Sequence, residues 1–202
     1  MQKNPLSMRE RREQGLLWVD TGENLNQQIF ARGLCQDFNL TRATETEKRQ
    51  AIWKKLFAFC GDHVWIEPPL TLAMGNTVSI GENTYINSNL TLVDDHKITI
   101  GKNVLIAPNV TITATNHPIH YKARMHGEMY CKEVVIEDNV WIGSQVVICA
   151  GVTIGMGSVI GAGSVVTKSI PPMSFAAGAP CKVIRSITED DLNEFEPVPT
   201  EE

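Results

Sequence analysis

Aliphatic residues recur at every sixth position from the middle of the chain onward, and the spacing is unbroken from Ile136 to Val166. A helix repeats every 3.6 residues and a strand alternates every two, so neither produces a period of six. An internal repeat of this kind predicts a solenoid whose unit is a short strand and a turn. The aliphatic positions are Ile80, Ile86, Leu92, Ile100, Ile106, Ile112, Ile136, Ile142, Ile148, Ile154, Ile160 and Val166.

The repeat predicts a mainly β fold in which three units of six residues close one triangular coil. One aliphatic side chain per unit points inward, so that stacked coils share a continuous apolar core. Small residues then occupy the crowded corners, where a larger side chain would obstruct the next coil. These small residues are Gly143, Gly155, Gly161, Ala107 and Ala162.

Two interruptions of the repeat are the expected positions of functional loops. The step from Leu92 to Ile100 is eight residues, which leaves an extra turn at residues 93–97. The step from Ile112 to Ile136 is 24 residues and contains the segment 115–131, which has no hexapeptide pattern. We expect residues 115–131 to protrude from the solenoid as a loop.

The first 61 residues have a different, helical pattern. Helices are expected at about residues 5–18 and 24–38, and Thr44 with Glu47 has the spacing of a capping box at the start of a third helix. Gly61 stands where a C-terminal cap would end that helix. The expected division is a helical region at 1–61, a β-helix domain at 62–185 and an acidic tail at 186–202. The third helix presents one apolar face, made of Ile52, Trp53, Leu56, Phe57 and Cys60.

Composition favours a soluble, cytoplasmic protein. The chain has 202 residues, of which 43% are hydrophobic and 20% charged. No apolar run approaches the roughly 18 residues of a membrane span, and no apolar segment of a secretory signal follows the polar amino terminus. Five cysteines without C-x-x-C spacing predict reduced, buried thiols rather than a disulfide framework or a cysteine zinc site.

Charge is unevenly distributed along the chain. The net charge is −5, but seven acidic residues and no basic ones follow Arg185, so the preceding chain carries +2. We expect the acidic tail to be solvated and frayed. Nothing resembles the basic stripe of a nucleic-acid-binding protein. The acidic residues of the tail are Glu189, Asp190, Asp191, Glu194, Glu196, Glu201 and Glu202.

Several sequence segments resemble those of a known protein family. They are NLTLVDD, GKNVLIAPNVTITATNHPIH, HGEMY, IEDNVWIGSQVVICAGVTIGMGSVIGAGSVVTKSIPP and AAGAPCKVIR. Together they resemble the galactoside and maltose O-acetyltransferases of the hexapeptide-repeat superfamily over nearly the whole chain. The resemblance implies a left-handed parallel β-helix and a homotrimer with active sites between subunits. It also implies acetyl transfer from acetyl-CoA, the co-substrate, to a hydroxyl of a small sugar acceptor, with no metal required.

His117 is the predicted general base. A sugar hydroxyl is a weak nucleophile, and an imidazole with a pKa near 6.5 suits removal of its proton during attack on the thioester. Residues alone leave His96, His120 and His126 equally eligible. The family resemblance assigns the role to His117, because the catalytic histidine of these enzymes stands at the NHP or GHP position of this loop.

The resemblance also implies an acceptor site. Asp20, Asn87, Asp95 and Met129 match family positions that contact the sugar, and Asn87 also matches a position credited with transition-state stabilisation. Amide and carboxylate groups suit this role because they hydrogen-bond hydroxyls, although Asn and Asp also commonly fill turns. Two departures put the acceptor in question. Ala73 replaces a Ser or Asp of the family, and residues 22–32 lack a counterpart to the arginine of the galactoside enzyme.

The donor site follows from the same resemblance. Small residues at Ser144 and Ala162 match positions where backbone groups meet the pantetheine arm of CoA. Basic residues near the end of the repeat suit the phosphates of CoA. The residues that match the phosphate end are Thr167, Lys168, Lys182 and Arg185.

Other interpretations remain open at this stage. His117, His120 and His126 lie within ten residues and are potential zinc ligands. A hexapeptide β-helix can also serve as a non-catalytic trimeric scaffold, although a phosphate-binding end has no use there. An amine acceptor, such as an amino sugar or antibiotic, requires the same base as a hydroxyl. Cys131 lies in the loop but has no identifiable paired base that would make it a nucleophile.

Overall fold

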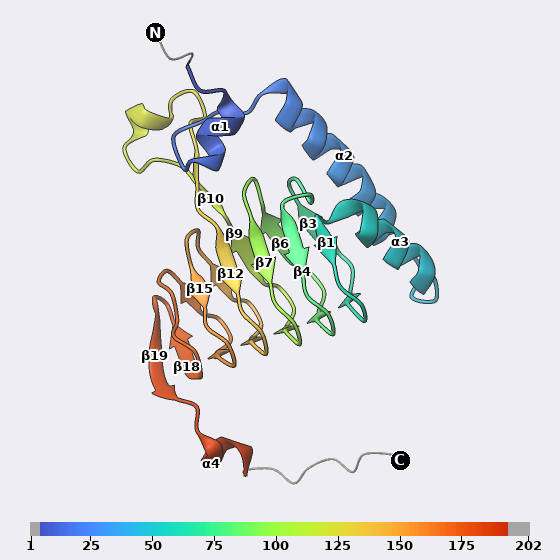
Figure 1. The fold of residues 1–202 in the computed structure, drawn as a ribbon, viewed down its shortest axis with the longest axis vertical. Helices are drawn as coiled ribbons and strands as arrows, with labels where there is room; N and C mark the ends of the chain where they lie inside the picture. Colours follow the sequence, from blue (N-terminus) through green and yellow to red (C-terminus); the bar gives the residue numbers. More distant parts are fainter. Residues whose placement is uncertain (1–4, 194–202) are drawn as a thin grey trace.

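A computed structural model describes residues 5–193, and its centre is a parallel β-helix (Figure 1). Three helices precede the strands, and a short fourth helix follows them. The helices are α1 (Met8–Glu13), α2 (Gly22–Asn39), α3 (Thr46–Leu56) and α4 (Glu189–Leu192). The tail predicted at residues 186–202 is therefore described only as far as residue 193.

Three parallel sheets form the faces of a triangular prism. The first face contains β1 (Phe59–Cys60), β4 (Val78–Ile80), β7 (Ile98–Ile100), β12 (Val134–Ile136) and β15 (Thr153–Ile154). The second face contains β2 (Trp65–Ile66), β5 (Tyr85–Ile86), β8 (Leu105–Ile106), β13 (Trp141–Ile142) and β16 (Val159–Ile160), and ends in the hairpin of β18 (Ser174–Gly178) and β19 (Cys181–Ser186). The third face contains β3 (Leu70–Leu72), β6 (Leu90–Val93), β9 (Thr111–Thr113), β14 (Val147–Ile148) and β17 (Val165–Val166).

The aliphatic positions stack in register, as the sixfold spacing predicts. On each face the aliphatic residue of the repeat pairs with its equivalent on the neighbouring coils, and all twelve of these residues from Ile80 to Val166 are buried. The register on the second face runs through Ile66, Ile86, Ile106, Ile142, Ile160 and Ala176. Because each apolar side chain lies directly on the next, the core is one continuous cluster along the prism.

The corners require small residues or a left-handed backbone. A Cβ added to Gly143 would lie 2.6 Å from the backbone nitrogen of Ala162 on the next coil, so only glycine fits. At another corner Asn83, Asn103 and Asn139 adopt positive φ angles of 56°, 53° and 59°. Asparagine tolerates this conformation better than most residues because its short polar side chain bonds locally.

Helices α2 and α3 cover the first coils (Figure 1). The side chain of Asn39 bonds the backbone of Leu70 twice, donating to its carbonyl at 2.9 Å and accepting from its N–H at 2.8 Å. The apolar face of α3 packs inward, with the Trp53 ring in edge contact with Phe38 and Trp65. Helices α2 and α3 thus cover the edge of the first coil, and Asn39 pairs backbone groups that the edge strand β3 would otherwise leave without partners.

The boundaries of α3 differ from the prediction. The N-cap residue is Glu45, whose carboxylate accepts from the backbone of Arg42, and no capping box forms at Thr44. The helix ends at Leu56, before Gly61, because the first strand of the solenoid already begins at Phe59. Cys60 therefore belongs to the core register opposite Ile80, not to the helix face.

The helix expected at residues 5–18 is shorter. It spans only α1, which begins with a capping box between Ser7 and Glu10. Gly15, with a φ of 67°, ends it, since glycine adopts the left-handed turn that closes a helix. The chain then extends to Trp18, which pairs in an antiparallel bridge with Met129.

Residues 115–131 leave the solenoid as a hairpin. Strands β10 (Thr115–Asn116) and β11 (Tyr130–Cys131) pair antiparallel, and the 3₁₀ helix η1 (Tyr121–Arg124) lies between them. The hairpin projects beside α1 at one end of the molecule (Figure 1). Its position is set by the bridge between Trp18 and Met129, whose backbone groups bond each other at 2.8 and 2.9 Å.

Candidate functional site

A hydrogen-bonded network joins two of the predicted acceptor residues. The amide nitrogen of Gln28 on α2 lies 3.4 Å from a carboxylate oxygen of Asp20 and 3.4 Å from one of Asp95. Burial and the nearby Asp95 carboxylate raise the pKa of Asp20. Two carboxylates held close with a neutral amide between them can accept hydrogen bonds from neighbouring hydroxyls of one ligand.

The network continues into the hairpin. The Thr115 hydroxyl donates to the second oxygen of Asp95 at 2.8 Å. Two residues further along, Nδ1 of His117 lies 2.9 Å from the backbone carbonyl of Glu128. A carbonyl only accepts, so Nδ1 carries the proton, and Nε2 of the neutral ring keeps its lone pair. The His117 ring is exposed in the single chain.

The Glu128 side chain plays no part in this orientation. Its carboxylate accepts from the backbone N–H of His126 at 2.9 Å, and that bond lowers the pKa of Glu128. The neighbouring Met129 is fixed by its backbone bridge to Trp18. The backbone of the hairpin, rather than a second side chain, therefore orients His117.

Cys131 is a packing residue. Its side chain is buried, and its sulfur accepts a hydrogen bond from the indole nitrogen of Trp18 at 3.3 Å. Burial raises the pKa of the Cys131 thiol, so it stays protonated and is a weak nucleophile. The interpretation that Cys131 is not a nucleophile agrees with this environment.

Ala73 lies beside the network. Its N–H donates at 2.7 Å to the buried carboxylate of Asp94, which also accepts from the backbone of Met74 and Gly75 and from the hydroxyl of Thr77. Asp94 therefore holds the turn at residues 73–77 next to the extra turn at 93–97. We call the set Asp20, Gln28, Ala73, Asp95, Thr115, His117 and Met129 the polar corner.

A second group of predicted residues lies along a different edge of the prism. The positions directly after β5, β8, β13 and β16, continued by Ala177 within β18, form a column of mostly small residues, joined by backbone bonds from coil to coil. Ser144 and Ala162 each follow a member of this column, and the Gly163 N–H donates to the Ser144 carbonyl at 2.8 Å. We call the column the small-residue corner, and its members are Asn87, Ala107, Gly143, Gly161 and Ala177.

Two predicted cations lie at the end of the small-residue corner. Lys182 on β19 pairs in register with Ala177. Arg185 stacks over the Phe175 ring and forms a two-pronged ion pair with Asp191 of α4, one arm of which measures 2.8 Å. This pair and the Thr188 N–H lower the pKa of Asp191 to about 2. The tail is expected to be solvated and frayed, but α4 and this ion pair order it as far as Asp191.

The single chain does not bring all predicted residues together. Asn87 precedes the third face, whereas Asp95 and His117 follow strands of that face, so the sheet separates them. Thr167 and Lys168 directly follow β17, also at the far side of the third face from Ala162. The predicted residues thus form two groups on two corners of the prism.

Sequence reasoning missed Gln28, Asn24 and Thr115. One signal was present: the buried residues of α2 are spaced three or four apart, and the first two of them are polar. A polar side chain on a core-facing position needs a partner, so it marks a buried network. These buried residues of α2 are Asn24, Gln28, Ala31, Cys35 and Phe38.

Among residues 5–193 no group of three or more His, Cys, Asp or Glu side chains is arranged to hold a metal ion. The three loop histidines considered as zinc ligands are thus not gathered around a common point. None of the helices described within residues 5–193 is long and apolar enough to cross a bilayer.

Three family models match the chain. The maltose acetyltransferase hexapeptide capping motif matches residues 20–61, which include α2 and α3. The hexapeptide repeat of succinyl-transferase matches residues 77–114, and the bacterial transferase hexapeptide of six repeats matches residues 133–168. The last two flank the hairpin of residues 115–131.

Individual relatives match almost end to end. The galactoside O-acetyltransferase of Escherichia coli (strain K12) is 50% identical over 191 residues, 94% of either chain. A solved galactoside acetyltransferase in complex with coenzyme A is 47% identical, with a TM-score of 0.91 over 98% of this chain and 100% of that one. A maltose O-acetyltransferase structure from Clostridium difficile 630 is 39% identical, with a TM-score of 0.89 over 92% and 100%. The chain is therefore an acetyltransferase of the hexapeptide-repeat superfamily and belongs to its galactoside and maltose O-acetyltransferase family.

Proposed function

We propose that this protein transfers the acetyl group of acetyl-CoA to a hydroxyl of a sugar, with His117 as the general base. The observation that carries the proposal is the bond between Nδ1 of His117 and the Glu128 carbonyl at 2.9 Å. Because Nδ1 carries the proton, Nε2 is free to accept one. A base held in this tautomer suits proton removal from a weakly acidic hydroxyl, which contributes about 10²–10⁴-fold to a rate.

The reaction is a direct transfer. Nε2 of His117 takes the hydroxyl proton as the sugar oxygen attacks the thioester carbon. The C–S bond then breaks, and the proton passes from the imidazolium to the departing sulfur. The side-chain amide of Asn87, whose oxygen accepts from the Ser88 N–H at 2.8 Å, keeps its N–H groups for the negative charge that develops on the carbonyl oxygen, together with backbone N–H groups that take no part in the coil-to-coil bonds. The buried, protonated Cys131 thiol supports a mechanism without an acetyl-enzyme.

The polar corner is the proposed acceptor site. Asp20, Asp95 and Met129 are linked to the segment that carries the base by the contacts of Gln28, Thr115 and the hairpin backbone. Two carboxylates that accept from adjacent hydroxyls orient a sugar ring and bring one further hydroxyl to Nε2. Ala73 offers no side-chain hydrogen bond, so the acceptor contacts differ there from those of enzymes with Ser or Asp.

The small-residue corner is the proposed donor site. From Asn87 to Gly161 it spans three strand spacings of about 4.8 Å each, without a bulky side chain. A long, narrow arm can lie against this backbone, and Ser144 and Ala162 line its path. Acetyl-CoA supplies the acetyl thioester there. Lys182 and Arg185 at the end of this corner, together with Thr167 and Lys168 from the facing corner of the next subunit, provide hydroxyl and cationic groups for the phosphates.

A homotrimer with shared active sites follows from the separation of the two corners. In a ring of three chains, the polar corner of one subunit meets the small-residue corner of the next, which is a heterologous interface that closes. The outer side of the second face supports this arrangement, since Leu105 and Trp141 lie in register there and remain 50% and 52% exposed. A contiguous apolar strip of this kind favours contact with another chain.

The proposed location of this enzyme is a reducing compartment such as the cytoplasm. All five cysteines are free in the described residues, and three of them are buried. Isolated thiols suit a compartment in which disulfides are rare.

The test is thiol release from acetyl-CoA with a panel of galactosides, glucosides, maltose and amino sugars. For His117→Ala we expect kcat to fall about 10²–10⁴-fold with acetyl-CoA binding unchanged. His126→Ala is the matched control, because this side chain lies in the same hairpin and is expected to keep wild-type activity. Equal activity of His117→Ala and wild type would refute the general base. Release with amines alone would replace the hydroxyl acceptor by an amine.

A further inference from the structure

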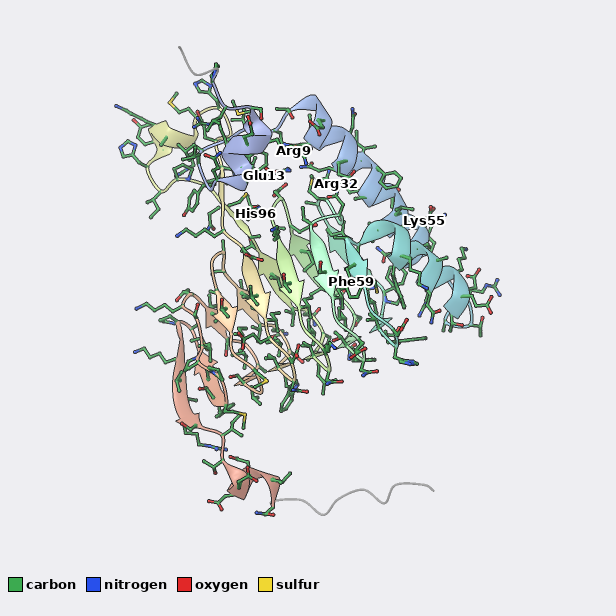
Figure 2. All side chains as sticks on the ribbon, in the orientation of Figure 1. Arg9, Glu13, Arg32, Lys55, Phe59 and His96 are labelled. Carbon is green, nitrogen blue, oxygen red and sulfur yellow. The ribbon has the colours of Figure 1, made fainter. Side chains whose placement is uncertain are left out.

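Trp18 lies at the base of the hairpin of residues 115–131, and it is only 1% exposed. It follows α1, whose residues Arg9 and Glu13 are labelled in Figure 2, and α1 contacts strand β11 of the hairpin. Both the backbone and the ring of Trp18 bond residues of the hairpin, the furthest of them 113 positions along the chain. The amino-terminal segment is therefore fastened to the loop that carries His117.

The backbone of Trp18 extends the hairpin by a third strand. Its N–H and carbonyl bond the carbonyl and N–H of Met129 at 2.9 and 2.8 Å. The next residue, Tyr130, pairs with Asn116 of β10 on the other side. Because successive residues of a strand bond in opposite directions, residues 129–131 lie between Trp18 and β10.

The hairpin has little else to fix its register. Its two strands, β10 and β11, have two residues each. A two-stranded hairpin is at best marginally stable in water, and a third strand or a packing surface is required for more. The tip offers no such surface in the single chain, since Ile119 and Met125 are 96% and 65% exposed. Trp18 is thus the strand that completes the base of the hairpin.

The ring of Trp18 is held from both ends of the amino-terminal segment. The guanidinium of Arg12 on α1 lies 5.4 Å from the ring centre, and it donates to the Asn24 side chain of α2 at 3.0 Å. The indole N–H donates to the sulfur of Cys131 on β11 at 3.3 Å. Removal of the ring would therefore release the segment from α1, from α2 and from the hairpin together.

A directed chain of hydrogen bonds continues from the ring to the polar corner. The Cys131 sulfur lies 3.6 Å from the hydroxyl oxygen of Thr115, and that hydroxyl donates its one proton to Asp95 at 2.8 Å. The thiol is then the donor to Thr115, because a carboxylate only accepts. Every step from Trp18 to Asp95 thus has one donor and one acceptor, and a fully paired network of this kind rigidifies its members.

The position of the strand at residues 128–131 determines the state of His117. Glu128, whose carbonyl accepts from Nδ1 of His117 at 2.9 Å, directly precedes Met129. A slip of this strand moves the carbonyl away from Nδ1, and the proton of the neutral ring is then free to occupy either nitrogen. A displacement of roughly 1 Å in a catalytic group costs up to about 10²-fold in rate.

We propose that Trp18 is a positioning residue for His117, because it holds the strand whose Glu128 carbonyl fixes the tautomer of the base. Trp18 is buried and acts through the hairpin rather than through contact with a substrate. The inference rests on the proposed function for its effect on rate, since it takes His117 as the general base.

The kinetic test compares Trp18→Ala with wild type in the thiol-release assay. We expect kcat to fall about tenfold or more, with KM for acetyl-CoA unchanged because the donor site lies at the other corner. Leu17→Ala is the matched control, since this exposed side chain is the neighbour of Trp18 on the same segment and should keep kcat within about twofold. If Trp18→Ala does not fold, Trp18→Leu keeps most of the apolar volume, and its expected loss is about threefold. A wild-type kcat in the Trp18 variant would overturn the inference.

A double variant separates positioning from a loss of structure. In the His117→Ala enzyme the base is already absent, so adding Trp18→Ala should lower kcat by less than about twofold. A residue that only stabilises the fold would lower kcat by the same factor in both backgrounds, and that result would also overturn the inference.

A spectroscopic test requires no turnover. Long-range proton–nitrogen NMR spectra at alkaline pH report which ring nitrogen of a neutral histidine carries the proton, and the His117 signals are identified by their absence from His117→Ala. Wild type and Leu17→Ala should show the proton on Nδ1, whereas Trp18→Ala should show a mixture of both tautomers. An unchanged pattern in Trp18→Ala overturns the inference. If His117→Ala keeps wild-type activity, the proposed function fails, and these spectra still decide whether Trp18 positions the ring.

Discussion

The two corners that flank the third face are built differently from the same repeat. Along the small-residue corner the hexapeptide spacing continues from coil to coil, and backbone bonds join each position to the next. The polar corner contains both interruptions of the repeat, and four separate segments of the chain contribute side chains to it. One corner is a smooth backbone surface, and the other is a cluster of interacting side chains.

This difference suits the two substrates. A regular repeat places equivalent backbone groups at equal steps, so it builds a long groove for a long ligand. An interruption lets residues distant in the sequence converge on one point, which is what orientation of a small acceptor requires. The third face keeps the two corners apart in one chain, which is why the proposed site requires a second chain.

Mixing of variants tests whether the two corners act across subunits. His117→Ala and Asn87→Ala enzymes should each lose about 10²-fold or more of kcat. If the two residues of one site belong to different chains, mixed trimers contain intact sites, and activity should recover to roughly a quarter of wild type by random assembly. Thiol release is measured after unfolding and refolding the variants together. Refolding each variant alone is the control, and no recovery in the mixture would place both residues of a site in one chain.

Gln28 tests whether the polar corner acts as a unit. In Gln28→Leu the two carboxylates lose the amide between them, and their mutual repulsion is no longer offset by donated hydrogen bonds. We expect kcat/KM for the acceptor to fall about tenfold, with KM for acetyl-CoA unchanged. Gln36→Leu, at an exposed position of the same helix, is the control. A parallel change in both substrates would contradict a role confined to the acceptor.

Asp20 tests the electrostatic strain within the polar corner. Its raised pKa means that the folded state holds the proton more tightly than the unfolded state. This group therefore stabilises the fold below its unfolded pKa of about 3.9, and the contribution is lost as pH rises through the folded pKa. Asp20→Asn should raise the thermal midpoint at pH 7 relative to wild type and lower kcat/KM for the acceptor about three- to tenfold.

Thermal unfolding of Asp20→Asn and wild type at several pH values measures this effect. The advantage of the variant should shrink as pH falls through the folded-state pKa of Asp20, which lies above its ordinary value, because the wild-type carboxyl then becomes protonated. A difference that is constant with pH would mean that ionisation of Asp20 is not its source.

The regular part of the fold was predictable because the sixfold period has one structural cause. Each of Ile86, Ile106 and Ile142 must point inward for the coils to stack, and they do. The prediction failed where another residue type takes the aliphatic position. Cys60 does so on the first coil, where the apolar spacing instead predicts a continuation of the third helix. Local capping rules likewise missed that the Glu45 carboxylate bonds the backbone before the helix begins.

The site was less predictable because its contacts join residues that lie far apart in the sequence. Sequence segments that resemble the family identify His117 and Asp95. No local pattern shows that the side chain of Gln28 bonds that of Asp95, 67 residues further along the chain. The separation of Asn87 from His117 also depends on which corner each occupies, and the hexapeptide spacing gives that only once the starting strand is known. Polar residues within the apolar face of α2 were the one local sign.

The smallest expected effect concerns the end of the small-residue corner. Asp191 occupies the guanidinium of Arg185, a predicted phosphate contact, and its pKa of about 2 keeps this ion pair formed throughout the usual assay range. Under this prediction, the CoA phosphates compete with that carboxylate. Asp191→Asn weakens the competitor, so the Kd for CoA should fall by about two- to threefold, the range of an exposed ion pair.

Asp190→Asn removes the same charge from α4 without touching Arg185. Calorimetric titration at low and high salt separates the two, because an effect of the local pair appears in Asp191→Asn alone, whereas an effect of net charge appears equally in both variants and disappears with salt. The second result would show that the ion pair with Asp191 does not limit the contact of CoA with Arg185.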